Sequence, residues 1–574
     1  IELKMCGIAG IIGKNASKDV LLKMTNAQKH RGPDYTGFWL DENVCFGHNR
    51  LSIIDLSENA NQPFQDEEER YQLIFNGEIY NYLELKNELD YNFVTSSDTE
   101  VLFAAYLKWG KACLNKLNGM FSFAVWDSVD KKLFAARDRF GVKPFYYHQS
   151  EDTLYFSSEI KTLHSAGIAK EPNKKVWANY FSFGSYGMPH ETFWKHIDQL
   201  PGGHCLEFEK NTLKIEKWYF FEKEIEKHKE KLSYEEIKNK YIVLLKDSIK
   251  LRFRADVSVG FNVSGGLDSS ALLAFVNQQE NKENIKAFTF YTNDDRYDEL
   301  PWVEEMVSLT ENSLQKVLLK PEEVKELAAK IDYHQDEPYG GIPTLAYAKI
   351  FEKARAKNTL VLLDGQGMDE QWAGYDYYLQ KNEATIQGVK KSPFKKEVLS
   401  KEMIALSQKP IYPKPFKKEL LNKQYRDLFY TKIPRALRFN DRVSMAYSTE
   451  LREPFLDYRL VELAFAQPLE YKIKDGIQKY VLRDIVSEYL SDSITYAPKR
   501  PLQTPQREWL ANELHELVDK KIEKIEKSNY KSWFDIEELK KEWQNYVEGD
   551  NQSSFHIWQW LSLSTYIDNT DLCK

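Results

Sequence analysis

The sequence predicts two domains, an antiparallel α+β domain followed by a doubly wound parallel α/β domain with a helical C-terminal part. Three observations support this fold class. The chain has 574 residues, which is too long for one hydrophobic core. Short apolar runs bounded by turn residues fill the first part of the chain. Further on, apolar strands alternate with helical patterns. We therefore place the domains at residues 6–215 and 232–574.

The first domain is expected to consist mainly of short strands. The apolar runs that predict them are residues 46–54, 71–75, 121–126, 132–135, 154–156 and 205–208. A helix is predicted over residues 101–109, and a Pro-Gly-Gly turn at residues 200–203 precedes the last strand. Residues 223–231 are charged and show no periodicity, so they predict a linker between the domains.

The second domain is expected to alternate strands and helices. Ser233 and Glu236 form a capping box that starts the first helix. Strands are predicted at residues 257–263, 287–291 and 360–363. A helix is predicted from residue 269, and the pattern is mainly helical from about residue 394 onward. Strands that alternate with helices are typical of a parallel sheet covered on both faces.

Composition excludes several classes of protein. A hydrophobic content of 42% is ample for folded cores, and a net charge of -8 argues against a nucleic-acid platform. The sequence shows no apolar run long enough to cross a bilayer and no signal-peptide pattern. The 5 cysteines lack the paired spacing of zinc or disulfide frameworks. We therefore expect a cytoplasmic protein that binds small molecules rather than nucleic acid or a membrane.

Cys6, beside a glycine, is the first candidate for catalysis. A cysteine at a chain start can use its own α-amine as general base, because the pKa of that amine is near neutrality. Asn76 and Gly77 supply a side-chain amide and a backbone N–H, the two donors that an oxyanion hole requires. Arg50 can pair with the α-carboxylate of an amino-acid substrate, and Asp98 can accept its α-ammonium.

The second candidate is the loop 264–270, Ser-Gly-Gly-Leu-Asp-Ser-Ser, between a predicted strand and a helix. Such a loop directs backbone N–H groups and the positive end of a helix at one anion, as pyrophosphate requires. Ser264, Ser269 and Ser270 add hydroxyl donors. Asp268 would repel phosphate unless a cation lay between them, so it indicates Mg²⁺. The spacing differs from that of a kinase-type P-loop.

A second polar loop, residues 364–370, follows the apolar run 360–363. The carboxyl ends of parallel strands meet at one edge of a sheet, where doubly wound folds bind their ligands. Asp369 is therefore expected to share the metal with Asp268. A thiol that can release ammonia and a loop that handles ATP, on one chain, indicate an ATP-dependent amidotransferase.

The whole chain resembles the asparagine synthetase B family, whose glutaminase domain belongs to the N-terminal-nucleophile amidotransferases. In the first domain the matching blocks are residues 30–34, 47–55, 76–81, 97–100, 137–144 and 156–161. In the second domain they are residues 264–270, 298–299, 336–338, 364–370, 441–446, 453–457, 479–483 and 498–500. The resemblance implies an αββα glutaminase sandwich followed by an ATP pyrophosphatase domain.

The resemblance also implies the members of each site. Cys6 is the nucleophile, and Asn76 and Gly77 form the oxyanion hole. Glutamine is held by Arg50, Leu51, Ser52, Ile53, Ile54, Asn76, Gly77, Glu78 and Asp98. ATP and pyrophosphate are held by Asn262, Ser264, Gly265, Gly266, Asp268, Ser269, Ser270, Phe290, Asp364, Gly365 and Lys499. The metal ligands are Asp268 and Asp369.

Two features depart from the family pattern. Residues 1–5 precede Cys6, which has no free α-amine while they are attached. We expect them to be absent from the working enzyme, as a self-cleaved propeptide or as residues of an expression vector; if they are retained, the thiol site is inactive. Gln366 stands where asparagine-forming members usually carry an acidic residue, and we count it among the catalytic residues. A glutamine can orient a substrate but cannot act as a base.

The implied reaction converts ATP, aspartate and glutamine to asparagine, AMP, pyrophosphate and glutamate. It proceeds through an acyl-adenylate and internally channelled ammonia, with Mg²⁺ as cofactor. Gln366 leaves open a different acceptor, such as a uronic acid of a surface polysaccharide or a peptide. A second alternative is a silent paralogue that only binds glutamine or nucleotide. The resemblance further implies a homodimer.

Overall fold

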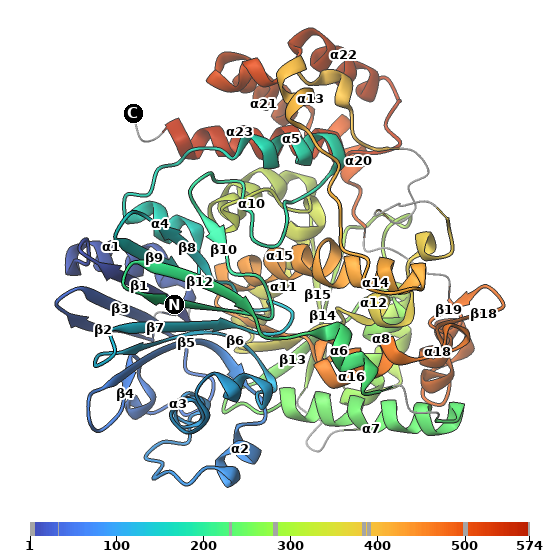
Figure 1. Cartoon of the computed structure of the whole chain (residues 1–574). Helices are drawn as coiled ribbons and strands as arrows, with labels where there is room; N and C mark the ends of the chain where they lie inside the picture. Colours follow the sequence, from blue (N-terminus) through green and yellow to red (C-terminus); the bar gives the residue numbers. More distant parts are fainter. Residues whose placement is uncertain are drawn as a thin grey trace.

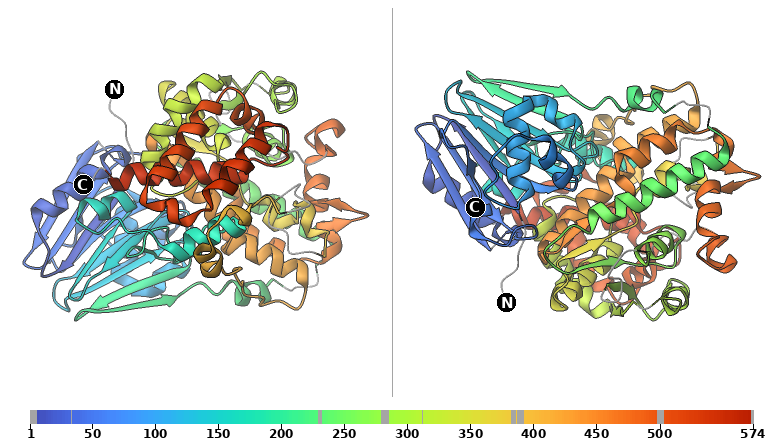
Figure 2. Two further views of the ribbon diagram at one scale, coloured as in Figure 1. Left: turned by 90° about the horizontal axis from the view of Figure 1, so that it is seen from above. Right: turned by 90° about the horizontal axis from the view of Figure 1, so that it is seen from below.

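The computed structural model has an N-terminal part of antiparallel sheets packed against a larger C-terminal part built on a parallel sheet (Figure 1). It describes residues 6–32, 34–228, 232–278, 285–310, 312–381, 386, 392–497 and 503–571. Figure 2 shows the N-terminal part on one side of the molecule and the parallel sheet with its helices on the other. The two predicted halves therefore lie side by side along an extended interface.

The N-terminal part is a sandwich of two six-stranded antiparallel sheets. The first has the order β10 (Asp198–Gln199), β8 (Tyr146–Gln149), β9 (Thr153–Ser157), β1 (Gly7–Gly13), β3 (Val44–Arg50), β2 (Tyr35–Asp41). The second has the order β12 (Thr212–Lys217), β11 (His204–Glu209), β7 (Lys132–Arg137), β6 (Gly119–Asp127), β5 (Tyr71–Ile79), β4 (Phe64–Gln65). Apolar side chains such as Phe46, Ile74 and Phe156 are buried between them.

Helices cover the outer faces of this sandwich. On the first sheet lie α1 (Lys18–Ala27) and α4 (Ile160–Ser165), whose apolar side chains share a core with β1. On the second lie α2 (Tyr82–Glu88) and α3 (Asp98–Trp109), packed on β5 and β6. The layers are therefore α, β, β and α, which confirms the predicted sandwich. It also places the start of β1 at one end of the two sheets.

The C-terminal part is built on a five-stranded parallel sheet. Its order is β15 (Leu314–Leu318), β14 (Lys286–Tyr291), β13 (Val259–Asn262), β16 (Val361–Leu363), β17 (Glu450–Arg452). The chain builds outward in one direction from β13 to β15 and in the other from β16 to β17. The switch point therefore falls between β13 and β16, and ligands bind at such a crevice in doubly wound sheets. The loops that follow these two strands are the two polar loops singled out in the sequence.

Helices cover both faces of the parallel sheet. One face carries α7 (Tyr234–Arg252), α8 (Leu267–Val276), α16 (Tyr458–Ala466) and α18 (Tyr480–Val486). The other carries α10 (Pro321–Gln335), α11 (Ile342–Ala356) and α15 (Lys432–Ala446). A helical cap of α13 (Lys401–Leu406), α20 (Gln506–Ala511), α21 (His515–Lys527), α22 (Ile536–Val547) and α23 (Phe555–Asp571) packs around α5 (Lys174–Phe183) of the N-terminal part (Figure 1).

The structure confirms the predicted fold class and corrects three details. The predicted strand over residues 46–54 ends at Arg50, because residues 51–54 turn away to pack against the C-terminal core. Part of the predicted linker is helix α6 (Phe221–Glu226), whose Phe221 and Ile225 are buried one turn apart. The short strands β15 and β17 were not predicted. In the described part of the chain, none of the helices is long and apolar enough to span a bilayer.

Candidate active site

Cys6 lies at the start of β1 and is half-buried at the contact between the two parts. Its thiol donates to Leu51 O at 3.6 Å, and Leu51 N donates to Cys6 Sγ at 3.4 Å. Burial raises the pKa of the Cys6 thiol to about 12. The thiol is therefore protonated at neutral pH, and a nucleophilic role requires a base beside it.

The predicted oxyanion-hole residues lie on β5, in the sheet that faces β1. Asn76 Nδ2 donates to Ser158 Oγ at 3.3 Å, and Ile8 N donates to the same oxygen at 3.0 Å. The Ser158 hydroxyl thus joins the strand of Cys6 to the Asn76 amide. Gly77 has φ 154, and a Cβ there would lie 2.1 Å from Met120 O on β6. Only glycine fits at this position.

Arg50 holds the loop that carries the predicted glutamine contacts. Its guanidinium donates to Ser57 O at 2.6 Å, to Asn61 Oδ1 at 2.9 Å and to Asp55 O. Within the loop Ser52 N donates to Asp34 Oδ2 at 3.0 Å. Leu51, Ile53 and Ile54 are buried against the core of the parallel sheet. The loop is therefore fixed from both parts of the molecule.

Acidic groups gather beyond Asn76. Asp98 Oδ2 accepts from Ile79 N at 2.8 Å, and burial raises the pKa of Asp98 to about 7. The pKa of Glu78 is also raised, by burial and by the nearby Glu450 carboxylate. Arg452 Nη2 of β17 lies 3.5 Å from Glu78 Oε2, and Arg452 Nε donates to Glu450 at 2.7 Å. A cation from the C-terminal part thus reaches the predicted glutamine site.

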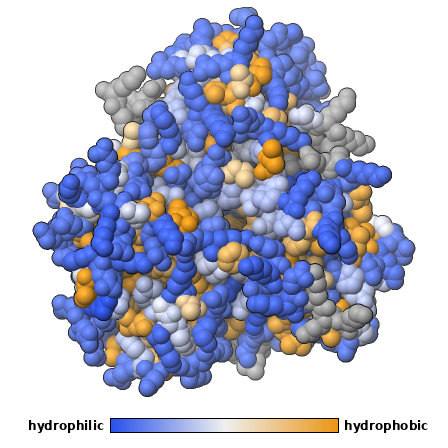
Figure 3. Space-filling view, viewed as in Figure 1, coloured by the Kyte–Doolittle hydropathy of each residue, from blue (hydrophilic) through white to orange (hydrophobic). Residues whose placement is uncertain are grey.

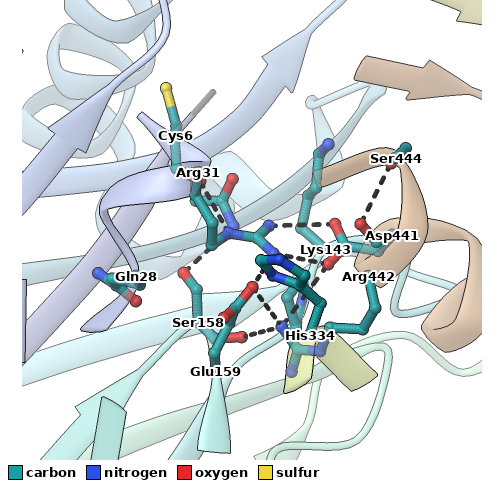
Figure 4. Close-up of polar contacts among 12 residues, drawn as sticks. Cys6, Gln28, Arg31, Lys143, Ser158, Glu159, His334, Asp441, Arg442 and Ser444 are labelled. Atoms are coloured by element: carbon teal, nitrogen blue, oxygen red, sulfur yellow. Dashed lines mark hydrogen bonds and ion pairs between the residues drawn. The ribbon is translucent and has the colours of Figure 1, made fainter. Parts of the chain in front are cut away.

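Arg31 connects Cys6 to the C-terminal part (Figure 4). Its Nε donates to Cys6 O at 3.1 Å. Its two Nη atoms bind both oxygens of Asp441 on α15, at 2.9 and 3.1 Å, and Nη1 also donates to Glu159 at 2.9 Å. The Arg31 side chain is fully buried, so these carboxylates balance its charge away from water. Helix α15 is therefore tied to the backbone of the candidate nucleophile.

The loop after β13, which was predicted to be an anion cradle, lies at the start of α8. Gly265 N donates to the Glu299 carboxylate at 3.2 Å, so a backbone N–H of the loop already binds an anionic oxygen. Ser264 and Ser269 interact through their hydroxyls at 3.1 Å, and Gly266 N donates to Ser264 Oγ at 3.4 Å. The Ser270 hydroxyl is buried and donates to Gly266 O at 2.7 Å. Ser270 therefore faces its own helix.

The loop after β16 lies directly against the first loop. A Cβ on Gly365 would lie 3.4 Å from Ser269 N. Lys479 Nζ, at the start of α18, lies 2.6 Å from Asp268 Oδ1 and 2.6 Å from Asp369 Oδ1. The sequence prediction that Asp268 and Asp369 converge is thus met in the geometry, with an ammonium between them. Lys499, the predicted phosphate lysine, lies outside the described residues.

A small pocket at the carboxyl ends of β13 and β14 brings together five of the residues predicted to hold ATP and pyrophosphate. Asn262, Ser264, Ser269, Phe290 and Asp364 all line it. Both polar atoms of the Asn262 amide are buried and have no hydrogen-bond partner within the protein. Burial raises the pKa of Asp364 to about 6. An unsatisfied buried amide costs stability unless a ligand pairs with it, so the Asn262 amide is a candidate for hydrogen bonding to a ligand.

A larger cavity of about 810 Å³, here called the acceptor chamber, opens beside these loops. Gln366, Asp369 and Lys479 line it together with the N-terminal half of α15. Helix α15 therefore borders the acceptor chamber at one end and binds Arg31, and through it Cys6, at the other. The face of the molecule in Figure 3 is mostly hydrophilic, with small scattered hydrophobic patches.

Sequence reasoning missed three residues that contact the predicted site residues. Lys479 was noted only as part of a block that matches the family. Nothing in the sequence around it indicates that it contacts Asp268 and Asp369, which are distant in the chain. Arg452 resembles a surface residue in the sequence. Ser158 was noted within a block, but its bridge between two strands depends on the packing of the sheets.

Comparison with known proteins places both halves. Residues 5–219 match the glutamine amidotransferase domain family, and residues 241–568 match the asparagine synthase family. Asparagine synthetase [glutamine-hydrolyzing] 1 of Bacillus subtilis (strain 168) is 32% identical over 92% of this chain and 91% of that protein. Asparagine synthetase [glutamine-hydrolyzing] 3 of the same organism is 30% identical over 92% of this chain and 95% of that protein. Amidase chyE of Penicillium rubens is 26% identical over 92% of this chain and 93% of that protein.

A sandwich of two antiparallel sheets that matches the glutamine amidotransferase domain family, joined to a parallel sheet that matches the asparagine synthase family, defines an ATP-dependent glutamine amidotransferase. Such an enzyme is a ligase that takes nitrogen from glutamine and consumes ATP. The chain belongs to the asparagine synthetase family.

Proposed function

We propose that the enzyme makes asparagine from aspartate, with glutamine as nitrogen donor and ATP as the activating substrate. The observation that carries the proposal is the meeting of Asp268, Asp369 and Lys479 at the switch point of the sheet. Two carboxylates and an ammonium that lie in contact suit the binding of a nucleoside triphosphate and its cation. This site lies between the unsatisfied amide of Asn262 and a chamber large enough for an acid.

In the N-terminal part, Cys6 Sγ attacks the side-chain amide carbon of glutamine. The oxyanion that forms accepts hydrogen bonds from the Asn76 amide and the Gly77 N–H. Expulsion of ammonia leaves a thioester, which water cleaves to glutamate. Because the Cys6 thiol is protonated at neutral pH, a base must remove its proton, and the α-amine of an N-terminal Cys6 is suited to do so.

Arg50 binds the α-carboxylate of glutamine and Asp98 its α-ammonium. The loop that Arg50 holds also contacts the C-terminal core, so glutamine binding and the position of that core are mechanically linked. Released ammonia remains nucleophilic only while it is unprotonated. Passage through the interface between the two parts keeps it from bulk water.

In the C-terminal part, a carboxylate oxygen of the acceptor attacks the α-phosphorus of ATP and releases pyrophosphate. The backbone N–H groups of Gly265 and Gly266 and the helix α8 N-terminus stabilise the departing pyrophosphate. The Lys479 ammonium adds a charged donor in the same place. Gln366 orients the acyl group, which ammonia then attacks to displace AMP.

The residues present fit Mg²⁺. Asp268 and Asp369 converge on one cation in the structure, and carboxylate oxygens are the ligands that Mg²⁺ takes. The two acids would hold the ion, and phosphate oxygens and water would complete its shell. When bound, it would neutralise charge on the phosphates. Lys479 would then turn from the acids toward the phosphate groups.

A second candidate is the same chemistry on a larger carboxylate, such as a uronic acid or a peptide. The neutral Gln366 favours it, because an anionic acceptor meets no acidic group at this position of the loop. The size of the acceptor chamber, about 810 Å³, also favours it. Aspartate remains the first choice because of the family to which the chain belongs.

The test supplies amide-¹⁵N glutamine, ATP, Mg²⁺ and aspartate and measures labelled asparagine by mass spectrometry. Labelled asparagine with AMP and pyrophosphate supports the proposal. A Cys6→Ser variant is expected to lose glutamine-dependent synthesis and to keep synthesis from ammonium salts. If wild-type enzyme gives no product from either nitrogen source, aspartate is not the acceptor.

A further inference from the structure

A second cavity adjoins the acceptor chamber. It encloses about 820 Å³ between the loop 182–189 of the N-terminal part and helices α14 (Glu419–Phe429) and α15, and is here called the second chamber. Gly184, Tyr186, Phe394 and Arg435 line both cavities. These residues therefore form the boundary between the two chambers. Arg435 contributes the charged group at this boundary.

Arg435 differs from the other cations around these chambers in having no ionic or hydrogen-bonded partner among the described residues. It lies on the N-terminal half of α15 and is partly exposed, and its guanidinium carbon lies 5.5 Å from the centroid of the Tyr186 ring. Arg438, one turn later, pairs with Glu337 at 2.6 Å. Lys479 lies between two carboxylates, and Arg483 donates to backbone carbonyl oxygens. A guanidinium without a partner is ready to bind an anion.

The proposed reaction brings a carboxylate acceptor into the acceptor chamber, which Arg435 lines together with Asp369 and Lys479. One carboxylate of the acceptor is adenylated beside Lys479 and Asp369, whereas any further carboxylate on the acceptor keeps its charge. A buried carboxylate is tolerated only when a cation pairs with it, and Arg binds carboxylates with two parallel hydrogen bonds. Gln366, on the same chamber wall, carries no charge that would repel it.

We infer that Arg435 binds a carboxylate of the acceptor that is not adenylated. The inference rests on the proposed adenylation of a carboxylate acceptor. In aspartate this second carboxylate is the α-carboxylate. In a longer polyacid it is the next acidic group along the chain, and the remainder extends past Arg435 into the second chamber. Tyr412, Tyr425 and Phe429 line that chamber and offer ring faces to such a remainder.

The test measures ATP–pyrophosphate exchange, which reports adenylation without the glutaminase site. Hydrogen bonds to charged groups contribute about 1.5–3 kcal/mol, so Arg435→Gln should raise KM for aspartate about 10- to 100-fold. The kcat of exchange should change little. KM for aspartate in Arg435→Lys should lie between the values for wild type and Arg435→Gln. β-Alanine, which is aspartate without its α-carboxylate, should be used equally poorly by wild type and Arg435→Gln. Arg70→Gln is the control: Arg70 pairs with Asp127 in the N-terminal part and lines neither chamber, so this variant should behave as wild type.

Two results would overturn the inference. One is an unchanged KM for aspartate in Arg435→Gln; the other is a loss confined to kcat, which indicates a structural role. If wild type does not exchange with aspartate, the aspartate proposal fails, and digalacturonate and galacturonate become the probes. Arg435→Gln should then weaken use of digalacturonate, which has a second carboxylate, and leave use of galacturonate unchanged. Absence of exchange with aspartate and digalacturonate alike also counts against the inference.

Discussion

Replacement of Lys479 by glutamine should separate the two half-reactions. Lys479 Nζ lies 2.6 Å from one oxygen of Asp268 and 2.6 Å from one of Asp369, and its side chain is 6% exposed. Glutamine is shorter and uncharged, so one buried charged donor is lost at the site where pyrophosphate forms. Loss of one donor of this kind costs about 3–4 kcal/mol of transition-state stabilisation. Adenylation should therefore slow about 10²- to 10³-fold.

The glutaminase half-reaction should remain, because Cys6 and Asn76 lie in the other part of the molecule. ATP–pyrophosphate exchange measures the first effect, and glutamate release from glutamine measures the second. Lys474→Gln is the matched control: this lysine is exposed on the neighbouring hairpin and contacts only Tyr480. Without the competing ammonium, Asp268 and Asp369 should also bind Mg²⁺ more tightly in Lys479→Gln. Exchange within threefold of wild type would refute the role of Lys479.

Three further predictions concern the N-terminal part and the contact between the parts. Gly77→Ala should abolish glutaminase activity and lower solubility, because the added Cβ would lie 2.1 Å from a backbone oxygen. Glutamine-dependent and ammonia-dependent synthesis are compared in the soluble fraction of this variant. Asp98 has a pKa of about 7 and must be ionised to bind an ammonium. KM for glutamine should therefore decrease as the pH rises from about 6 to 8. Asp98→Asn should raise KM for glutamine and remove its dependence on pH. If KM of Asp98→Asn changed with pH as it does in wild type, Asp98 would not be the group that binds the ammonium. Asp441→Asn leaves the buried Arg31 with Glu159 as its one remaining carboxylate partner and should lower the free energy of unfolding by about 3 kcal/mol, measured as a lower urea midpoint by tryptophan fluorescence. An unchanged midpoint would show that this ion pair adds no stability.

The raised pKa of Asp98 also affects folding. The folded protein retains a proton on this carboxyl that the unfolded chain, with its ordinary pKa of 3.8, has released. The contribution of Asp98 to the free energy of unfolding therefore declines as pH rises from about 4 to 7 and is constant above that interval. Stability of wild type relative to Asp98→Asn should decrease over the same range.

Sequence patterns predicted the positions of the two polar loops, because each loop is encoded by residues that are adjacent in the chain. The loop 264–270 is proposed to bind anions because its glycines and serines are adjacent in the chain, and its place after β13 follows from the apolar run before it. The second loop was predicted in the same way. The convergence of Asp268 and Asp369 followed from the rule that parallel strands end at one edge of a sheet.

Short or charged elements escaped prediction. β17 has three residues, Glu450, Leu451 and Arg452, and its two charged side chains suggest a surface position. They are buried because Arg452 bonds to Glu450 at 2.7 Å and donates to backbone carbonyls of residues 252 and 254. Helix α6 was taken as linker because its buried face has only two apolar residues, one turn apart.

The sequence alone thus determined the fold class, the two chemistries and most of the residues proposed for them, because glycine-rich loops and apolar runs are local features. Tertiary structure alone decided which charges meet. Arg31 and Asp441 are 410 residues apart, and Lys479 and Asp268 are 211 apart. No local pattern distinguishes a lysine that pairs with two acids from one that is solvated, or an arginine between two chambers from one on the surface. Burial makes the charges of Arg31 and Lys479 require partners, and only tertiary packing brings those partners to them.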